Sequence, residues 1–225
     1  MKLRPRLQMT ADLVPPGLAV ADIGTDHAYL PVYLVRHGVA PRAIASDIGA
    51  GPLRNAAGTI AQFGLQDQIE LRLSDGFRRF AIADAKCWVL AGMGGTLMAR
   101  LFEAAPWLRA PGTVIVAQPM RRAHELRSWL ISNGFFIEQE SACRDAGRVY
   151  LALRAVHYGV PRDYPPGYIY YGELICDKSS HAREYLSREL KLIRVRMEAL
   201  RQSGQSREEF ASLEEAYDDF SARYL

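Results

Sequence analysis

The chain has 225 residues, of which 49% are apolar and 24% are charged, and its formal net charge is +3. This length allows one α/β domain and one additional element. No apolar run approaches the roughly 20 residues that span a bilayer, and MKLRPRLQM lacks the apolar core of a signal peptide, so we expect a cytoplasmic protein with no membrane segment. The three cysteines form no ligand pair, so we expect neither disulfides nor a metal site.

The first informative stretch is DIGTDHAYLP, residues 22–31, which follows a short apolar run. Asp22 closes a strand on a carboxylate, Gly24 allows a tight turn beside a ligand, and Pro31 fits the first turn of a helix. The glycines of a GxGxxG loop are absent, and Asp26 would repel a diphosphate, which argues against a dinucleotide. The stretch therefore predicts a different nucleotide-type ligand.

Apolar runs and helical patterns then alternate along the chain. Strands are predicted near 18–23, 42–47, 68–73, 86–91 and 112–118, with helices between them and another at about 121–132. The runs 135–143 and 148–156 face each other across a turn and predict an antiparallel pair. This order predicts a Rossmann-like α/β fold whose sheet is mostly parallel with an antiparallel last strand, as in class I methyltransferases.

The ends of four successive strands carry groups that suit S-adenosylmethionine, whose ribose hydroxyls, adenine amine and sulfonium all favour acceptors. Asp47 can accept from both ribose hydroxyls, and Asp75 can accept from the adenine amine while Gly76 allows close approach. Glycines after the fourth strand leave room around the methyl group. The predicted cofactor-binding residues are Asp22, Gly24, Thr25, Asp26, His27, Asp47, Asp75, Gly76, Ala91, Gly92 and Met93.

The chain resembles the bacterial tRNA (adenine-22-N1)-methyltransferases, in which ADIGTDHAYLP, a GP pair, a DG pair, AGMGG and an LRxWL helix occur in this order. The resemblance covers essentially the whole chain. It implies a class I fold, S-adenosyl-L-methionine as methyl donor, S-adenosyl-L-homocysteine as product, and N1 of an adenine in the D arm of tRNA as acceptor. The family usually has QPN after the fifth strand, whereas this chain has Met120 at the third position and therefore lacks an amide that would touch the base or the chain.

Catalytic roles are predicted for Asp26 and His27. Adenine N1 already carries a lone pair, so its attack on a methyl group needs positioning and no prior deprotonation. Because the product is a cationic purine, Asp26 would stabilise the developing charge, unless it only caps the next helix. His27 would donate to the base or orient Asp26, with a structural role as the alternative. Tyr29 would offer a ring to the extruded base, although its helical spacing with Tyr33 favours packing against the sheet.

The C-terminal part predicts a separate helical element. Residues 158–172 contain three prolines and predict a linker that holds neither helix nor central strand. Apolar residues spaced by three and four then predict two helices of an antiparallel coiled-coil hairpin, joined by a turn at 203–206 with a capping box of Ser206 and Glu209. The predicted division is a methyltransferase domain at 1–158, a linker at 159–178 and the hairpin at 179–225, in a monomer or a weak dimer.

Charge divides this hairpin into a basic first helix and an acidic second helix. Pairing between the helices would explain the division, and so would a basic face directed at tRNA phosphates. The predicted tRNA-binding residues are Tyr29, Gln118, Arg121, Arg122, Arg188, Lys191 and Arg194. The alternatives are a class I methyltransferase for a small molecule or another RNA site, and a catalytically silent tRNA-binding protein.

Overall fold

A seven-stranded sheet forms the centre of the computed structural model, which describes residues 1–160, 162–203 and 206–225. The strand order is β3-β2-β1-β4-β5-β7-β6. The parallel strands are β1 (Val20–Ile23), β2 (Ala43–Asp47), β3 (Ile69–Leu73), β4 (Cys87–Met93) and β5 (Val114–Pro119). β7 (Arg148–His157) runs antiparallel to β5 and to β6 (Phe135–Asp145). The predicted sheet is confirmed.

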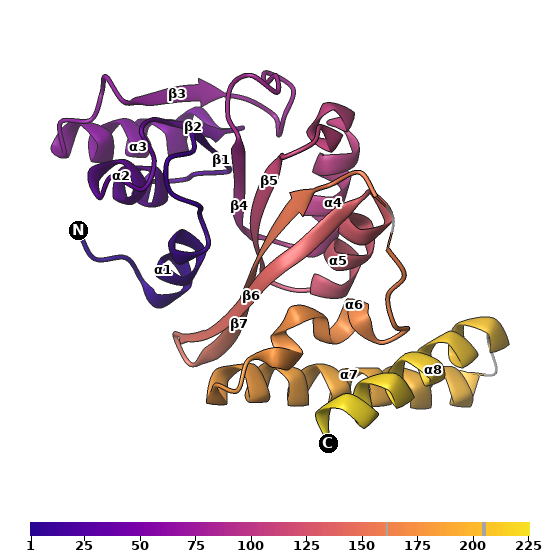
Figure 1. Ribbon diagram of the computed structural model, residues 1–225. Coiled ribbons are helices and arrows are strands. Elements are labelled where there is room, and N and C mark those ends of the chain that lie inside the picture. The colour runs from indigo at the N-terminus through magenta and orange to yellow at the C-terminus, as the bar shows by residue number, and fades with distance from the viewer. Residues whose placement is uncertain (161, 204–205) are drawn as a thin grey trace.

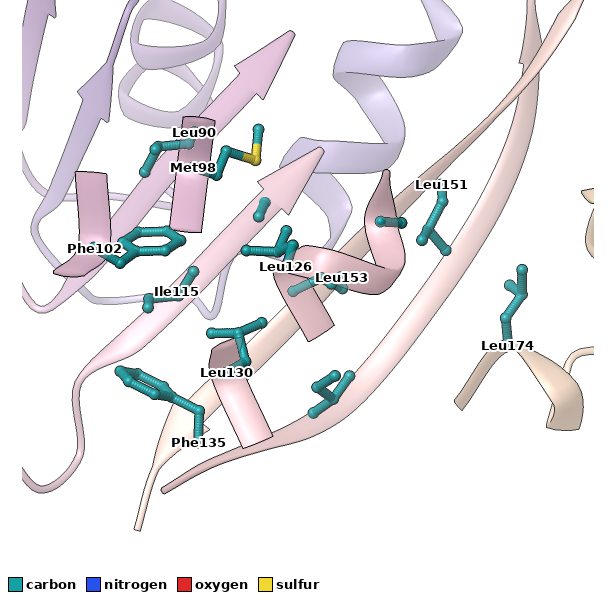
Figure 2. Close-up of a cluster of buried hydrophobic side chains, with 14 of the residues drawn as sticks. Leu90, Met98, Phe102, Ile115, Leu126, Leu130, Phe135, Leu151, Leu153 and Leu174 are labelled. Atoms are coloured by element: carbon teal, nitrogen blue, oxygen red, sulfur yellow. The ribbon is translucent and has the colours of Figure 1, made fainter. Parts of the chain in front are cut away.

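Helices cover both faces of this sheet (Figure 1). One face carries α2 (Tyr29–Arg36) and α3 (Ala50–Gln62), and the other carries α4 (Gly95–Glu103), the short η1 (Pro106–Arg109) and α5 (Ala123–Ser132). β1 and β5 are buried along their whole length because helices pack on both sides of them. Figure 2 shows Met98 and Phe102 of α4 near Leu90 and Ile115 of the sheet, in the same buried cluster as Leu126 and Leu130 of α5.

Strand order reverses between β1, which continues to β2 and β3, and β4, which continues to β5. In an open α/β sheet, this reversal opens a crevice beyond the carboxyl ends of the strands, because successive crossover helices leave toward opposite faces. DIGTDHAYLP and the GMGG run both follow the strands at this reversal. The fold therefore brings the two most informative motifs of the sequence to one place.

An N-terminal helix that the sequence did not predict, α1 (Pro5–Asp12), packs on the same face as α2 and α3. Its apolar side, with Met9 and Ala11, is buried near the outer β6–β7 pair. Figure 1 places α1 beside the turn end of the β6–β7 pair. The basic residues of the N-terminus are thereby held close to the carboxyl edge of the sheet.

The predicted linker at 159–178 contains two short helical segments, and because the first of them lies within 158–172, the prediction that 158–172 holds no helix is wrong. They are α6 (Tyr168–Tyr171) and η2 (Gly172–Cys176). Tyr168, Tyr171 and Leu174 are buried against the α4–α5 side of the core, which explains why this short segment is ordered as helix despite the preceding prolines. Pro161, part of the same prediction, lies outside the described residues.

The C-terminal helices α7 (Ser180–Ser203) and α8 (Arg207–Tyr224) form the predicted antiparallel hairpin within one chain. Contacts fix the register at both ends: the Tyr224 hydroxyl donates to the Arg183 carbonyl at 2.8 Å, and Arg196 pairs with Glu209. Ser206 caps α8 by accepting from the Glu209 N–H at 3.2 Å, while residues 204 and 205 of the predicted turn lie outside the described part. No helix in the described residues is long and apolar enough to cross a membrane.

Candidate active site

The loop after β1 has an unusual backbone. Gly24, Asp26 and Ala28 have φ values of 82°, 53° and 55°, so every second residue is left-handed, and two of the three are not glycine. The N–H groups of Gly24 and Thr25 both donate to the Ser46 carbonyl at 2.8 Å, which ties this loop to the end of β2. Left-handed non-glycine residues cost free energy and concentrate at functional sites. The loop is therefore held in a shape that its sequence alone does not favour.

Asp22 is a buried carboxyl group at the base of this loop. It is 4% exposed, and the Thr25 hydroxyl donates to its Oδ2 at 2.7 Å. The pKa of Asp22 is raised to about 6: burial is the main cause, the bond from Thr25 opposes it, and the nearby Asp47 adds to it. A cationic ligand group above Asp22 would favour its ionised form.

A cavity of about 820 Å³ opens above the loop. The predicted site residues that line it are Asp22, Gly24, Thr25, Asp26, His27, Tyr29, Ala91 and Gly92. The N-terminal segment forms the opposite wall with Lys2, Arg4 and Arg6. Eight of the residues expected at the site are thus brought together, and a basic wall joins them.

The remaining predicted cofactor groups lie at the ends of β2 and β3. Asp75 lines a smaller cavity of about 240 Å³ together with the apolar side chains of Ile48 and Leu73. Asp47 directly precedes Ile48, and its Oδ1 accepts from the Gly49 N–H at 2.8 Å. Ile48 is 70% exposed, so its apolar side chain offers a free surface to a flat ring. An apolar face between two carboxylates suits a purine nucleoside.

Two glycines and a methionine shape the same edge. Gly76 has a φ of 54°, which favours glycine, and a larger residue would also have to displace the end of the Leu101 side chain. Met93 extends its methyl group over Gly24, which has no Cβ to obstruct it. Met93 therefore forms part of the floor between the loops after β1 and β4.

Asp26, His27 and Tyr29 form an exposed cluster at the mouth of the larger cavity. The Asp26 side chain is 66% exposed, and its Oδ2 lies 3.6 Å from Nε2 of His27. The His27 and Tyr29 rings stack with centroids 5.2 Å apart and planes 10° apart. The cluster thus presents a carboxylate and a ring stack to whatever enters the cavity.

Two alternative roles predicted for these residues are wrong. Asp26 does not cap the next helix, because the N-cap of α2 is Ala28 and no side chain caps it. Tyr29 does not pack against the sheet, because it is 44% exposed at the cavity. Tyr33, one turn later, is the partly buried residue of the pair and accepts a hydrogen bond from Gln8 at 2.9 Å.

Arg6 is a site residue whose role the sequence did not reveal. Its Nη1 donates to Gln118 Oε1 at 2.7 Å, lies 3.7 Å from the Met120 sulfur and sits directly over Gly92. Gln118 is fully buried, and its Oε1 also accepts from the Gly92 N–H at 3.2 Å. The prediction that Gln118 contacts tRNA directly is therefore wrong, because its amide is used to hold Arg6 and the loop after β4.

The loops after β4 and β5 are joined through their backbones. The Met120 N–H donates to the Met93 carbonyl at 2.8 Å, and the Gly95 N–H donates to the Arg121 carbonyl at 2.9 Å. A Cβ on Gly95 would collide with the Arg122 carbonyl, so only glycine allows this approach. Arg121 and Arg122 are consequently exposed beside the carboxyl edge of the sheet.

A buried ion pair anchors the C-terminal part to the core. Arg127, the arginine of the LRSWL stretch, donates to both Glu140 oxygens at 2.8 and 3.1 Å, and both side chains are essentially inaccessible. Arg127 also donates to the carbonyls of Ile169 and Tyr170, and Glu140 accepts from the Leu174 N–H. The segment that leads into the hairpin is thereby fixed to α5 and β6.

The three basic residues predicted on α7 have different surroundings. Arg194 donates to the Tyr217 hydroxyl, and Arg188 donates to the Val149 carbonyl at 3.2 Å and lies over the Tyr185 ring. In the described part of the chain, Arg196–Glu209 is the one ion pair that crosses between α7 and α8. Arg194 is thus held across the hairpin by Tyr217 of α8, whereas pairing between the helices does not account for Arg188 or Lys191.

Three comparisons place this fold and site among known proteins. The family described as "Methyltransferase domain" matches residues 3–153. The tRNA (adenine(22)-N(1))-methyltransferase of Bacillus subtilis is 36% identical over 155 residues, which are 69% of this chain and 65% of that relative. The match therefore spans slightly less than two thirds of that protein.

Solved structures align over the whole chain. The B. subtilis m1A22 tRNA methyltransferase has a TM-score of 0.85 at 29% identity, covering 100% of this chain and 99% of that one. A Streptococcus pneumoniae protein in complex with S-adenosyl-L-methionine has a TM-score of 0.82 at 28% identity, covering 100% of both chains.

The reversed strand order, the carboxylates at successive strand ends and the family match define a class I methyltransferase. The chain belongs to the methyltransferase-domain family, and it is similar in sequence and in structure to the tRNA (adenine(22)-N(1))-methyltransferase of B. subtilis.

Proposed function

We propose that the protein transfers a methyl group from S-adenosyl-L-methionine to N1 of adenine 22 in the D arm of tRNA. The observation that carries the proposal is the single cavity in which the loop after β1, Gly92 and the basic N-terminal segment meet. The B. subtilis relative is named for this activity, and the similar S. pneumoniae structure contains bound S-adenosyl-L-methionine. A cytoplasmic location and the domain boundaries at 158 and 178 stay predictions.

The predicted cofactor-binding residues lie at two cavities, of about 820 and 240 Å³, and each cavity would hold a different part of the donor. Asp47 has one carboxylate oxygen free of the Gly49 bond and can accept from the ribose hydroxyls. Ile48 and Asp75 offer an apolar face and an acceptor for adenine. The methionine end would lie toward Gly24 and Asp22, where an ionised buried carboxylate attracts an amino group. When bound, the donor supplies an electrophilic methyl group on a sulfonium.

The exposed cluster would act on the adenine. The His27–Tyr29 stack offers a flat surface to a base that has left its helix, which holds N1 in line with the methyl group. As methylation makes the purine cationic, the Asp26 carboxylate stabilises the charge that develops. His27 orients this carboxylate from 3.6 Å. No residue needs to remove a proton from N1.

The RNA surface would extend from this cavity along exposed arginine and lysine side chains. It comprises Lys2, Arg4, Arg121, Arg122, Arg188, Lys191 and Arg194, which come from the N-terminus, the loop after β5 and α7. Arginine and lysine at these places can neutralise phosphates on both sides of the target base. Gln118 would support this surface only indirectly, through Arg6.

The test is methyl transfer to matched tRNAs. Purified protein is incubated with labelled S-adenosyl-L-methionine and unmodified tRNA that carries either adenine or guanine at nucleotide 22, and the product is digested to nucleosides. We expect label in 1-methyladenosine with adenine and none with guanine. Equal labelling of both tRNAs would show that the methylated nucleotide is not nucleotide 22. Transfer to a small molecule without RNA would show that tRNA is not the substrate.

A further inference from the structure

A second cleft, of about 390 Å³, lies between the loop after β5 and α7. The loop contributes Met120, Arg121 and Arg122, and α7 contributes residues between 188 and 196. The cleft is separate from the cofactor cavities, and neither the proposed donor site nor the exposed Asp26 cluster uses it. Its volume is that of a nucleoside-sized ligand site.

The inner wall of this cleft is apolar and aromatic. Ile193 and Leu213 are buried at its base, and Leu192 is 55% exposed along its side. The rings of His124 and Tyr170 stack against each other with centroids 5.2 Å apart and planes 26° apart. Burial lowers the pKa of His124, which favours the neutral ring. Such walls accept a flat base by stacking, whatever its identity.

The rim of the cleft is basic. Arg121, Arg122, Arg188 and Arg196 line it, against one acidic residue, Glu189. Arg122 and Arg196 already pair with Glu125 and Glu209. In the described residues no ion pair occupies Arg121, which therefore stays available for a phosphate. The charge of the rim is complementary to an RNA backbone.

The cleft adjoins the active site, from which it is separated by the side chains of Met120 and Arg6. Met120 lines the cleft, and its sulfur lies 3.7 Å from Nη1 of Arg6, which sits over Gly92 in the main cavity. The far wall is also rigid, because the Tyr170 carbonyl is held by the buried Arg127 at 2.9 Å. A ligand in the cleft would thus be separated from the target base by the Met120 and Arg6 side chains, and it would lie against a preorganised surface.

We infer that this cleft binds the base of one nucleotide next to the methylated adenine, with its phosphate at Arg121. The inference rests on the proposed function and deepens it: the enzyme holds two neighbouring nucleotides. One is the adenine that is methylated, and the other fixes the position of the RNA on the protein. Leu192 and the His124–Tyr170 stack would contact the second base, so recognition would include an unpaired neighbour of the adenine.

The test compares two charge-matched variants of the full chain. Leu192→Glu places a carboxylate in the cleft, whereas Val195→Glu places the same charge on the same helix at a side chain that is 59% exposed and does not line the cleft. We expect Leu192→Glu to weaken tRNA binding about tenfold more than Val195→Glu does, within the range for loss of one stacked base. Donor affinity should be the same in both.

The occupant is then tested with tRNAs that lack the base at nucleotide 21 or at nucleotide 23. One of the two should bind the wild-type protein about tenfold more weakly. The same tRNA should show no further loss with Leu192→Glu, because the stacking interaction is already absent. Equal binding by the two variants, or a base effect that persists in Leu192→Glu, would overturn the inference. Methylation of intact tRNA is scored in parallel, so that a wild-type protein that binds but leaves adenine 22 unmethylated contradicts the proposed function alone.

Discussion

The two sides of the active site draw their residues from very different distances along the chain. One short stretch, from the end of β1 to the start of α2, supplies Asp22, Gly24, Asp26 and Tyr29. On the other side, Arg6 reaches Gln118 across 112 positions, and Arg127 reaches Ile169 across 42. The side of the site around the β1 loop is therefore a local motif placed by the sheet, while the RNA side exists only once distant segments have packed. Damage to long-range packing should affect the RNA side first.

Removal of the buried Arg127–Glu140 ion pair, which links the core to the hairpin, should have the largest effect on stability. Arg127→Ala leaves Glu140 charged, buried and without its partner, which should lower the free energy of unfolding by about 3–5 kcal/mol. Urea denaturation measures this loss. Arg144→Ala, which removes an exposed pair with Glu184, is the control and should cost less than about 1 kcal/mol. The double variant Arg127→Met, Glu140→Leu should regain only part of the stability, because the Ile169 and Tyr170 carbonyls and the Leu174 N–H lose their partners. Equal costs for Arg127→Ala and Arg144→Ala would show that the link is not an anchor.

On the cofactor side, Asp22 should make stability depend on pH. Its pKa in the folded protein, about 6, is above the ordinary 3.8, so the folded state holds this proton more tightly. The stability that protonated Asp22 contributes is present below about pH 4 and is lost as pH rises through about 6. The difference corresponds to about 3 kcal/mol at about 1.4 kcal/mol per pH unit. Asp22→Asn should lack this loss, so denaturation of both proteins from pH 4 to 7.5 should converge at acid pH; parallel curves would argue against a raised pKa.

The chemical role of the local motif can be separated from its binding role. Asp26→Asn keeps the shape of the side chain and removes its charge, so turnover should fall about 10- to 100-fold, or about 1.4–2.7 kcal/mol of transition-state stabilisation. Donor affinity, measured by calorimetry, should hardly change. Asp67→Asn, at an exposed position outside both cavities, should leave turnover unaffected. Full turnover with normal donor binding in Asp26→Asn would remove the proposed role.

The smallest effect concerns the exposed face of α7. Reversing Arg188, Lys191 and Arg194 to Glu should weaken tRNA binding and flatten its salt dependence, by about 0.7–0.9 in slope for each phosphate that the protein no longer neutralises. Reversing Arg36, Arg42 and Lys86, which lie at the amino edge of the sheet, supplies a control of equal charge. An unchanged slope for the α7 variant would take the hairpin off the RNA surface.

The same contrast explains which parts of the fold could be predicted from the sequence. Each of the five parallel strands is a short apolar run that ends in a turn, so its position followed from the residues to within about two positions. The coiled-coil spacing predicted α7 and α8 for the same reason. α6 was missed because prolines dominate its neighbourhood, and only burial of Tyr168 and Tyr171 against the core explains its helix.

The site was predictable where its chemistry is local. A carboxylate at a strand end and a glycine in the next turn identify Asp22 and Gly24 without knowledge of their neighbours. The sequence around Gln118 does not distinguish an amide that faces RNA from one that binds Arg6. The burial of Gln118 in the folded protein shows that it binds Arg6. The spacing of Tyr29 and Tyr33 predicts a shared helix face, but Tyr29 starts the helix at the cavity mouth and stays exposed. The Arg127–Glu140 pair depends on tertiary packing that no local pattern records.

The most direct test of the proposed activity maps the modification along the RNA. A methyl group on N1 blocks the pairing edge of adenine, so reverse transcription of tRNA treated with protein and S-adenosyl-L-methionine should stop at nucleotide 22. We expect a stop at that nucleotide alone, dependent on the donor and strongly reduced with Asp26→Asn. A protein that binds donor and tRNA yet gives no stop, or a stop elsewhere, would contradict methyl transfer to N1 of adenine 22.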